Sequence, residues 1–174
     1  ARRDGVSSLD ALDGVSGREV WGRRSTSDSV LRVSRGPIES CRAQQAMNTV
    51  IIITEPGDGL GGLRRLIPDT CSVQDAGFGR LLIQDVGRRA FLGPCPEVWE
   101  VMDPRERDLV LQTVVEPTFF GIDYSDLEFC KDLLMAVADR DDVVVDNDHG
   151  VIAKGAEFAR MLRSRPGWDW RVSP

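Results

Sequence analysis

The sequence is poor in the residues that build metal sites and nucleophile–base sites. It contains one histidine, His149, and four cysteines, none of them in a C-x-x-C pair. Zinc sites need several Cys or His ligands at short spacing, so a zinc site is not indicated. The nucleophile-elbow pattern G-x-S-x-G is also absent, and a triad would have to use the single histidine. We expect reduced thiols and a cytoplasmic location.

Long apolar runs and lysines are also scarce. No segment approaches the roughly 18 apolar residues of a membrane span, and no charged-then-apolar signal peptide opens the chain. The only lysines are Lys131 and Lys154, which we interpret as the arginine bias of a GC-rich bacterial genome. The net charge of −6 argues against general nucleic-acid binding, which needs clustered basic residues.

Composition divides the chain at Met47. Residues 1–46 hold eight Arg and six acidic residues, a net charge of +2, so residues 47–174 carry −8. The first segment has few apolar residues, with a weak helix expected at 8–15 and a short strand at 29–33. We therefore predict a poorly structured, flexible or extension-like leader over 1–46 and a single domain over 47–174. The alternative is a basic arm that binds an acidic partner or the domain's own acidic face.

The pattern after Met47 predicts an α+β fold. The β-branched run Val50–Thr54 is typical of a strand buried on both faces. Val86-Gly87-Arg88 separates two apolar runs and predicts a hairpin. Asp103, followed by Pro104 and Glu106, has the signature of a capped helix start. With the strand at 118–123 and the helix at 127–138, we expect a mixed β-sheet with three or four short helices packed on it.

A glycine loop follows the first strand. Gly57, Gly59 and Gly62 match G-x-G-x-x-G between a strand and a helix, where backbone N–H groups bind a dinucleotide's pyrophosphate. Asp58, however, places a negative charge where the phosphate would lie. The short helix and the hairpin after it also favour a simple turn. A nucleotide-binding domain is therefore our second alternative function.

The strongest chemical pattern lies in the segment 118–154. A strand ending near Asp123, a helix, and a strand ending at Asp146 would form a β-α-β unit if the two strands are parallel neighbours. Asp123, Asp146 and Asp148 would then meet as oxygen ligands for Mg²⁺ or Mn²⁺. Asp123, Asp146 and His149 would be the catalytic residues of a hydrolase or phosphoryl-transfer enzyme.

The same residues also have a purely structural interpretation. Asn147-Asp148-His149-Gly150 is a turn composition, with glycine where a positive φ is required. Residues 143–146 and 151–154 would then be the arms of an antiparallel hairpin, with Asp146 and Asp148 bonded to backbone N–H groups of the turn.

Near the end of the chain, Trp168 and Trp170 form a W-x-W pair after Arg165. Trp and Arg are enriched at binding hot spots, so these three residues are our candidate partner-binding residues. The alternative is that the indole rings cover the core.

With no complete catalytic set in view, we expect a non-catalytic, acidic cytoplasmic protein that acts through protein–protein contact. A small bacterial binding or immunity-type module has these properties. No cofactor is expected unless the Mg²⁺ or Mn²⁺ alternative holds, and the oligomeric state stays open.

Overall fold

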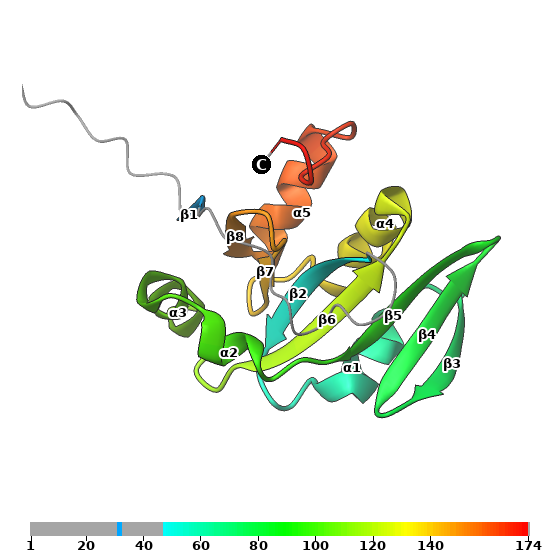
Figure 1. The fold of residues 1–174 in the computed structure, drawn as a ribbon, viewed down its shortest axis with the longest axis horizontal. Helices are drawn as coiled ribbons and strands as arrows, with labels where there is room; N and C mark the ends of the chain where they lie inside the picture. The colour runs from blue at the N-terminus through cyan, green and yellow to red at the C-terminus, as the bar shows by residue number, and fades with distance from the viewer. Residues whose placement is uncertain (1–30, 33–46, 174) are drawn as a thin grey trace, which may run out of the picture.

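A computed structural model describes residues 31–32 and 47–173 of the chain (Figure 1). The strands are β1 (Leu31–Arg32), β2 (Asn48–Thr54), β3 (Ser72–Gly77), β4 (Arg80–Asp85), β5 (Arg88–Pro94), β6 (Thr118–Tyr124), β7 (Val144–Asp146) and β8 (Val151–Lys154). The helices are α1 (Gly59–Leu66), α2 (Val98–Val101), α3 (Pro104–Leu111), α4 (Leu127–Val137) and α5 (Gly155–Ser164). None of these helices is long and apolar enough to span a bilayer.

The described strands form one sheet in the order β1-β8-β7-β2-β6-β5-β4-β3. The α+β class is confirmed. The prediction of a mixed sheet is wrong, because every pairing among these strands is antiparallel. Five helices are described rather than three or four, since the single turn expected near residues 97–102 closes as α2.

The central strand β2 is buried on both faces, as its β-branched run predicts. Val50 and Ile52 enter one core, and Ile51 and Ile53 enter the other, all at most 2% exposed. Successive side chains of a strand point to opposite faces, so only an unbroken apolar run can serve two cores.

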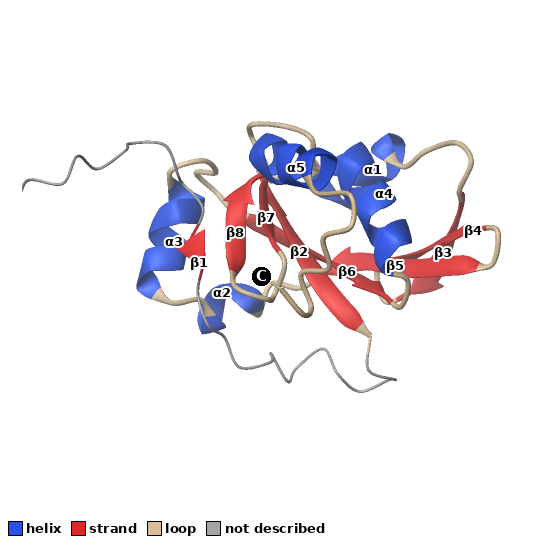
Figure 2. Cartoon of the chain, turned by 90° about the horizontal axis from the view of Figure 1, so that it is seen from above, coloured by secondary structure: helices blue, strands red, loops and turns tan. Residues whose placement is uncertain are grey.

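The larger core lies under α1, α4 and α5, which cover one side of the sheet in Figure 2. The side chain of Asp126 caps α4 by accepting a hydrogen bond from the Phe129 N–H at 2.8 Å. The apolar stripe of α4, including Leu133, Leu134 and Val137, packs on the strands. A ring cluster from α5 and the C-terminal segment closes this core.

The smaller core lies under α2 and α3 on the other face. The predicted start of α3 is confirmed, because Asp103 and Glu106 form a complete capping box. Val98 and Val110 from this layer belong to one buried cluster with side chains of β2, β6, β7 and β8, and this cluster includes none from β3 or β4. Among the described residues, therefore, no helix covers this face at the end of the sheet that contains β3, β4 and β5.

The described part of the leader is one short strand. Leu31 pairs with Ile152 and Arg32 with Val151, at the β8 edge of the sheet. This pairing confirms the short strand predicted within 29–33. Residues 1–30 and 33–46, with the weak helix predicted at 8–15, lie outside the described residues, and the boundary at Met47 stays a prediction.

Tyr124, the only tyrosine of the chain, gives a test of the larger core. It is fully buried, and its hydroxyl accepts a hydrogen bond from Trp170 Nε1 at 2.9 Å. Burial raises the pKa of this phenol above its ordinary value of 10. The native state therefore keeps a proton that the unfolded state loses above pH 10. We expect stability to fall by about 1.4 kcal/mol per pH unit there.

The tyrosinate ultraviolet absorbance should accordingly appear together with unfolding, measured by circular dichroism along an alkaline titration. Tyr124→Phe removes the only tyrosinate signal and serves as the blank. A tyrosinate transition centred near pH 10 in still-folded protein would show that Tyr124 is accessible to solvent.

Candidate functional site

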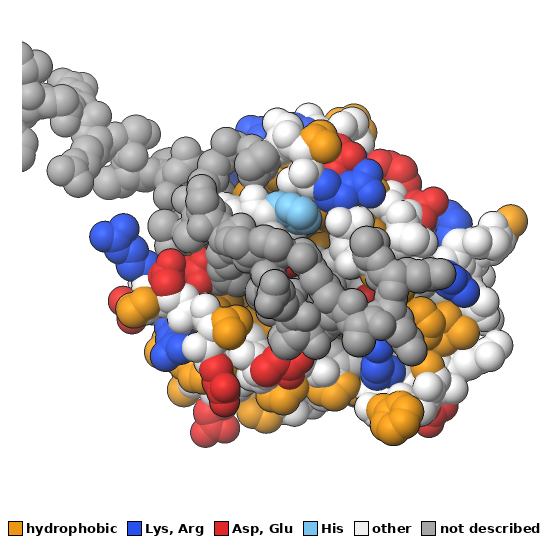
Figure 3. All heavy atoms as spheres, in the orientation of Figure 1, with side chains coloured by type: hydrophobic (Ala, Val, Ile, Leu, Met, Phe, Trp, Pro, Cys, Tyr) orange, Lys and Arg blue, Asp and Glu red, His pale blue; other side chains and the backbone are white. Residues whose placement is uncertain are grey.

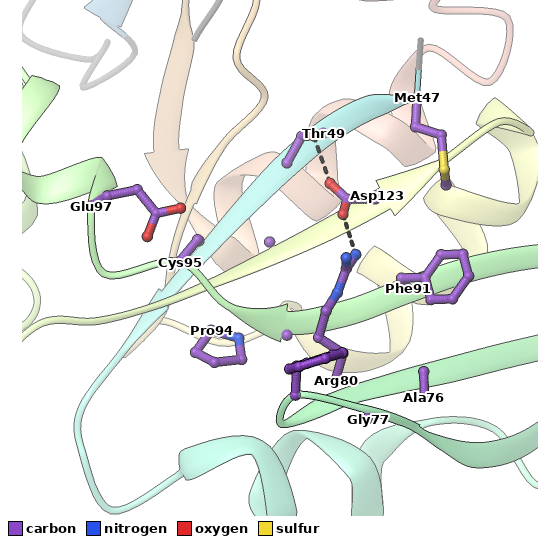
Figure 4. A pocket seen from close by; sticks show the side chains of 13 residues that line it. Met47, Thr49, Ala76, Gly77, Arg80, Phe91, Pro94, Cys95, Glu97 and Asp123 are labelled. Atoms are coloured by element: carbon purple, nitrogen blue, oxygen red, sulfur yellow. Dashed lines mark hydrogen bonds and ion pairs between the residues drawn. The ribbon is translucent and has the colours of Figure 1, made fainter. Parts of the chain in front are cut away.

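At the β3–β5 end of this second sheet face, the described residues line a cavity of about 480 Å³ (Figure 4). Strands β2 to β6 and the segment after β5 supply its walls. Its lining residues are Met47, Thr49, Ala76, Gly77, Phe78, Arg80, Phe91, Gly93, Pro94, Cys95, Glu97, Gly121 and Asp123. We call this the open-face cavity.

Asp123 connects the polar groups on the floor of this cavity. On β6 it lies opposite Thr49 of β2 and opposite Phe91 of β5. Its carboxylate accepts a hydrogen bond from the Thr49 hydroxyl at 2.7 Å and forms an ion pair with Arg80 (Figure 4). The Asp123 side chain is 16% exposed and that of Arg80 is 41% exposed, so the pair lies at the boundary with solvent.

The position of Arg80 depends on its neighbours on β5. Its guanidinium carbon lies 5.2 Å from the centroid of the Phe91 ring, within cation–π range. A Cβ on Gly93 would lie 2.6 Å from Arg80 Cγ, so only glycine leaves room for the arginine stem. Ion pair, ring and glycine together hold the guanidinium in one place on the cavity floor.

Phe78 lies at the rim of the cavity in an unusual conformation. It is the first residue of the two-residue turn joining β3 to β4, and its φ of 54° is followed by 69° at Gly79. Positive φ at both positions is the requirement of a type I′ turn, which favours Asn, Asp or Gly at the first position. For a bulky residue this conformation is an outlier. The Phe78 side chain is also fully exposed, at 101%.

Val86 provides a second example at the opposite end of β4. It is the first residue of the β4–β5 turn, has a φ of 34°, and is 96% exposed. In Figure 3 an apolar side chain projects at each of these two hairpin tips. Val86 does not line the open-face cavity, so the two tips share backbone geometry but not surroundings.

A second concavity, of about 500 Å³, lies on the other side of the segment 94–97. It is mostly apolar, with Trp99 and Phe119 among its walls and the exposed Leu111 and Val115 at its margin. The Glu55 carboxylate fixes this margin by accepting the Val115 N–H at 2.6 Å. We call this the apolar groove.

The predicted metal site is not assembled, because β6 and β7 are not neighbours. Strand β2 lies between them, with Asp123 opposite Thr49 and Asp146 opposite Ile51. Two strand spacings and a two-residue shift separate the two aspartate Cα atoms by about 12 Å. That distance is too large for one ion with oxygen ligands at about 2–2.6 Å. Within residues 47–173, no group of three or more His, Cys, Asp or Glu side chains could hold a metal.

Asp146, Asp148 and His149 instead belong to the β7–β8 hairpin, which confirms the antiparallel hairpin and the role predicted for Asp146. The bond predicted from the Asp148 side chain to a backbone N–H stays a prediction. The carboxylate of buried Asp146 accepts the Asp148 N–H at 3.0 Å. The Asn147 side-chain oxygen accepts the N–H groups of His149 at 2.9 Å and of Val151 at 3.0 Å. Asp148, with a φ of 55°, and Gly150, with a φ of 90°, reverse the chain.

The glycine loop lacks the geometry of a dinucleotide site. Of its three glycines only Gly59 has a positive φ; Gly57 and Gly62 do not. At the start of α1, Asp58 forms an ion pair with Arg140 at 2.7 Å, so a carboxylate already lies at this helix end. The chain then enters β3 at the far edge of the sheet, and no parallel strand follows β2.

The prediction that Trp168 and Trp170 form a partner-binding patch near the C-terminus is also wrong, because both side chains are buried. Trp168 is 8% exposed and Trp170 is fully buried, because both rings pack against Phe158. Between them, Asp169 bonds to the Arg171 guanidinium at 2.7 Å, and this contact lowers the pKa of the Asp169 carboxyl to about 2. Of the three predicted partner-binding residues, only Arg165 is exposed, directly after α5.

Of the residues that the cavity brings together, only Asp123 was among the candidates predicted from the sequence. Nothing local marks Thr49, Arg80 or Glu97, since their proximity follows from the strand register. For Phe78 the sequence did contain a signal. Glycines on both sides, Gly77 and Gly79, indicate a turn, and an aromatic residue between them places an apolar side chain at the tip of that turn. Comparison of the chain with protein-family models, with curated proteins and with solved structures gave no match.

The two hairpin tips allow a direct test of backbone strain. We expect Phe78→Asn and Val86→Asn each to raise the free energy of unfolding by roughly 1 kcal/mol. Asparagine tolerates the left-handed conformation, which costs other residues about 1–2 kcal/mol, and both native side chains are exposed. Urea denaturation measures the change. A loss of stability in Phe78→Asn would show that the ring packs against the protein after all.

Proposed function

We propose that this chain is a non-catalytic binding module that contacts a protein partner through the open-face cavity and the Phe78 tip. The observation that carries the proposal is the fully exposed, left-handed Phe78. Strained residues persist when the surrounding structure or a function requires them. The fully exposed ring gains no burial from the described part of the chain that would offset the strain, whereas insertion into a partner would bury it.

The surroundings of Phe78 support a binding role. Aromatic residues dominate protein–protein hot spots, and fixed polar groups at the edge of a hot spot orient the partner. The Asp123 carboxylate is already engaged by Thr49 and Arg80, which suits a preorganised surface better than a proton-transfer group. The apolar groove, with exposed Leu111 and Val115, is a second candidate contact surface.

The charge and the cysteines support the finer parts of the proposal. A net charge of −6 favours a partner with a basic surface, because complementary potentials steer association. Among the described cysteines, Cys71 and Cys130 are free thiols, which supports a reducing, cytoplasmic setting. We place the module among small bacterial binding proteins of the immunity type.

The test compares the two hairpin tips. Tagged full-length protein captures partners from a lysate of its own cells, and a captured protein is then purified for affinity measurement. We expect Phe78→Ala to raise Kd roughly 30-fold, because a hot-spot aromatic contributes about 2 kcal/mol or more. Val86→Ala is the matched control: an equally exposed turn residue outside the cavity, for which we expect an unchanged Kd.

Equal binding by the wild type, Phe78→Ala and Val86→Ala would refute contact through the Phe78 tip. Circular dichroism and urea denaturation of each variant show whether a loss of binding reflects a loss of fold.

A further inference from the structure

The walls of the apolar groove are built from side chains that hold one another in place. The rings of Trp99 and Phe119 both line the groove, with centroids 5.8 Å apart. The guanidinium carbon of Arg107 lies 5.1 Å from the centroid of the Trp99 ring, within cation–π range. The same guanidinium donates a hydrogen bond to the Glu100 carbonyl at 3.1 Å and so connects α3 to α2. Preorganised walls reduce the entropy that a ligand loses on binding.

The groove presents apolar surface that the described part of the chain does not cover. At its margin, Val115 is 77% exposed and Leu111 is 46% exposed. Three prolines also line the groove: Pro56, Pro96 and Pro117. Because proline has no backbone N–H, these parts of the wall offer no donor of their own. A ligand in the groove therefore gains affinity chiefly by burying apolar surface.

Carboxylates surround this apolar surface. Glu116 lines the groove, Glu55 binds two backbone N–H groups at its margin, and Glu100 lies on α2. Glu100 and Glu116 are exposed, and neither forms an ion pair with another residue in the described part of the chain. Arg107 supplies one positive charge against three carboxylates, so these four side chains carry a net negative charge. In Figure 3, acidic and hydrophobic side chains lie side by side around α2 and α3.

The geometry points to a short segment of a partner protein, with a bulky apolar side chain beside a lysine or arginine, as the occupant of the apolar groove. The apolar side chain would lie against Trp99, Leu111 and Val115, and the cation would pair with Glu116. Apolar burial would supply most of the affinity, and the complementary charge would orient the segment. The groove and the open-face cavity share no lining residue, so this site is separate from the contact proposed through Phe78.

The test uses the full chain and four blocked dipeptides at equal ionic strength: N-acetyl-leucyl-lysine amide, N-acetyl-leucyl-glutamine amide, N-acetyl-leucyl-glutamate amide and N-acetyl-alanyl-lysine amide. Two-dimensional NMR follows the backbone amides during each titration. We expect saturable shifts at Trp99, Val115 and Glu116 with the leucyl-lysine probe. The Kd should be about fivefold higher for leucyl-glutamine, the upper range for an exposed ion pair. It should be roughly tenfold higher for alanyl-lysine, which buries less apolar surface.

Two matched pairs of variants locate the binding. Glu116→Gln should raise the Kd of the leucyl-lysine probe about fivefold and leave that of leucyl-glutamine unchanged. Asp69→Asn removes an equal charge at an exposed position outside the groove lining and should change neither Kd. Val115→Ala should raise the Kd of both probes about threefold, whereas Val86→Ala, also an exposed valine, should not. All four positions are exposed, so no change removes a core side chain.

Several outcomes would overturn the inference. The absence of saturable shifts at the groove with every probe would show that it takes no such segment. Binding of leucyl-glutamate as tight as that of leucyl-lysine would show that the carboxylates select no cation, and equal binding of alanyl-lysine would show that the apolar wall contributes nothing. Equal effects of Glu116→Gln and Asp69→Asn would reduce the interaction to nonspecific attraction.

Phe78→Ala separates this inference from the proposed function. The variant should leave the Kd of the leucyl-lysine probe unchanged, because Phe78 does not line the groove. If the probes fail while Phe78→Ala still weakens partner binding, the contact through the Phe78 tip stands and the assignment of the groove falls. If the probes bind as expected while Phe78→Ala leaves partner binding intact, the assignment of the groove stands alone.

Discussion

The burial of β2 on both faces is the constraint on which the rest of the structure depends. Its apolar residues supply two cores, so helices must pack on both sides of the sheet at its centre. Its position between β6 and β7 makes all three strands alternate in direction. The same position separates Asp123 from Asp146 and brings Thr49 beside Asp123 instead.

The two helical layers differ in extent, and this difference creates the candidate site. On one face, α1, α4 and α5 cover the sheet and enclose the larger core. On the other face, α2 and α3 are short and reach only the half of the sheet nearest β8. Strands β2, β4 and β6 therefore present polar side chains to the cavity, where Thr49, Arg80 and Asp123 bond to one another at the surface.

The two hairpin turns, at Phe78-Gly79 and Val86-Gly87, each contain one residue that suits the turn and one that is strained in it. Both turns need positive φ at two residues, and both place an apolar side chain where asparagine would be more stable. Gly79 and Gly87 adopt positive φ without steric cost, whereas Phe78 and Val86 adopt it with strain. Only Phe78 lines a cavity with fixed polar groups, which is why we assign the contact to that tip.

The sequence by itself determined the α+β class, the doubly buried run of β2, the β4–β5 hairpin, the capped α3 and the turn after Asp146. These features follow from local chemistry, since periodicity, capping residues and glycine positions act within a few residues. Strand order was decided only by the tertiary structure: an acidic residue at a strand end does not specify which strand lies beside it. The burial of Trp168 and Trp170 depended in the same way on Phe158 and Tyr124, distant in sequence. The cavity that joins Phe78, Arg80, Glu97 and Asp123 exists only because the sheet register sets them side by side.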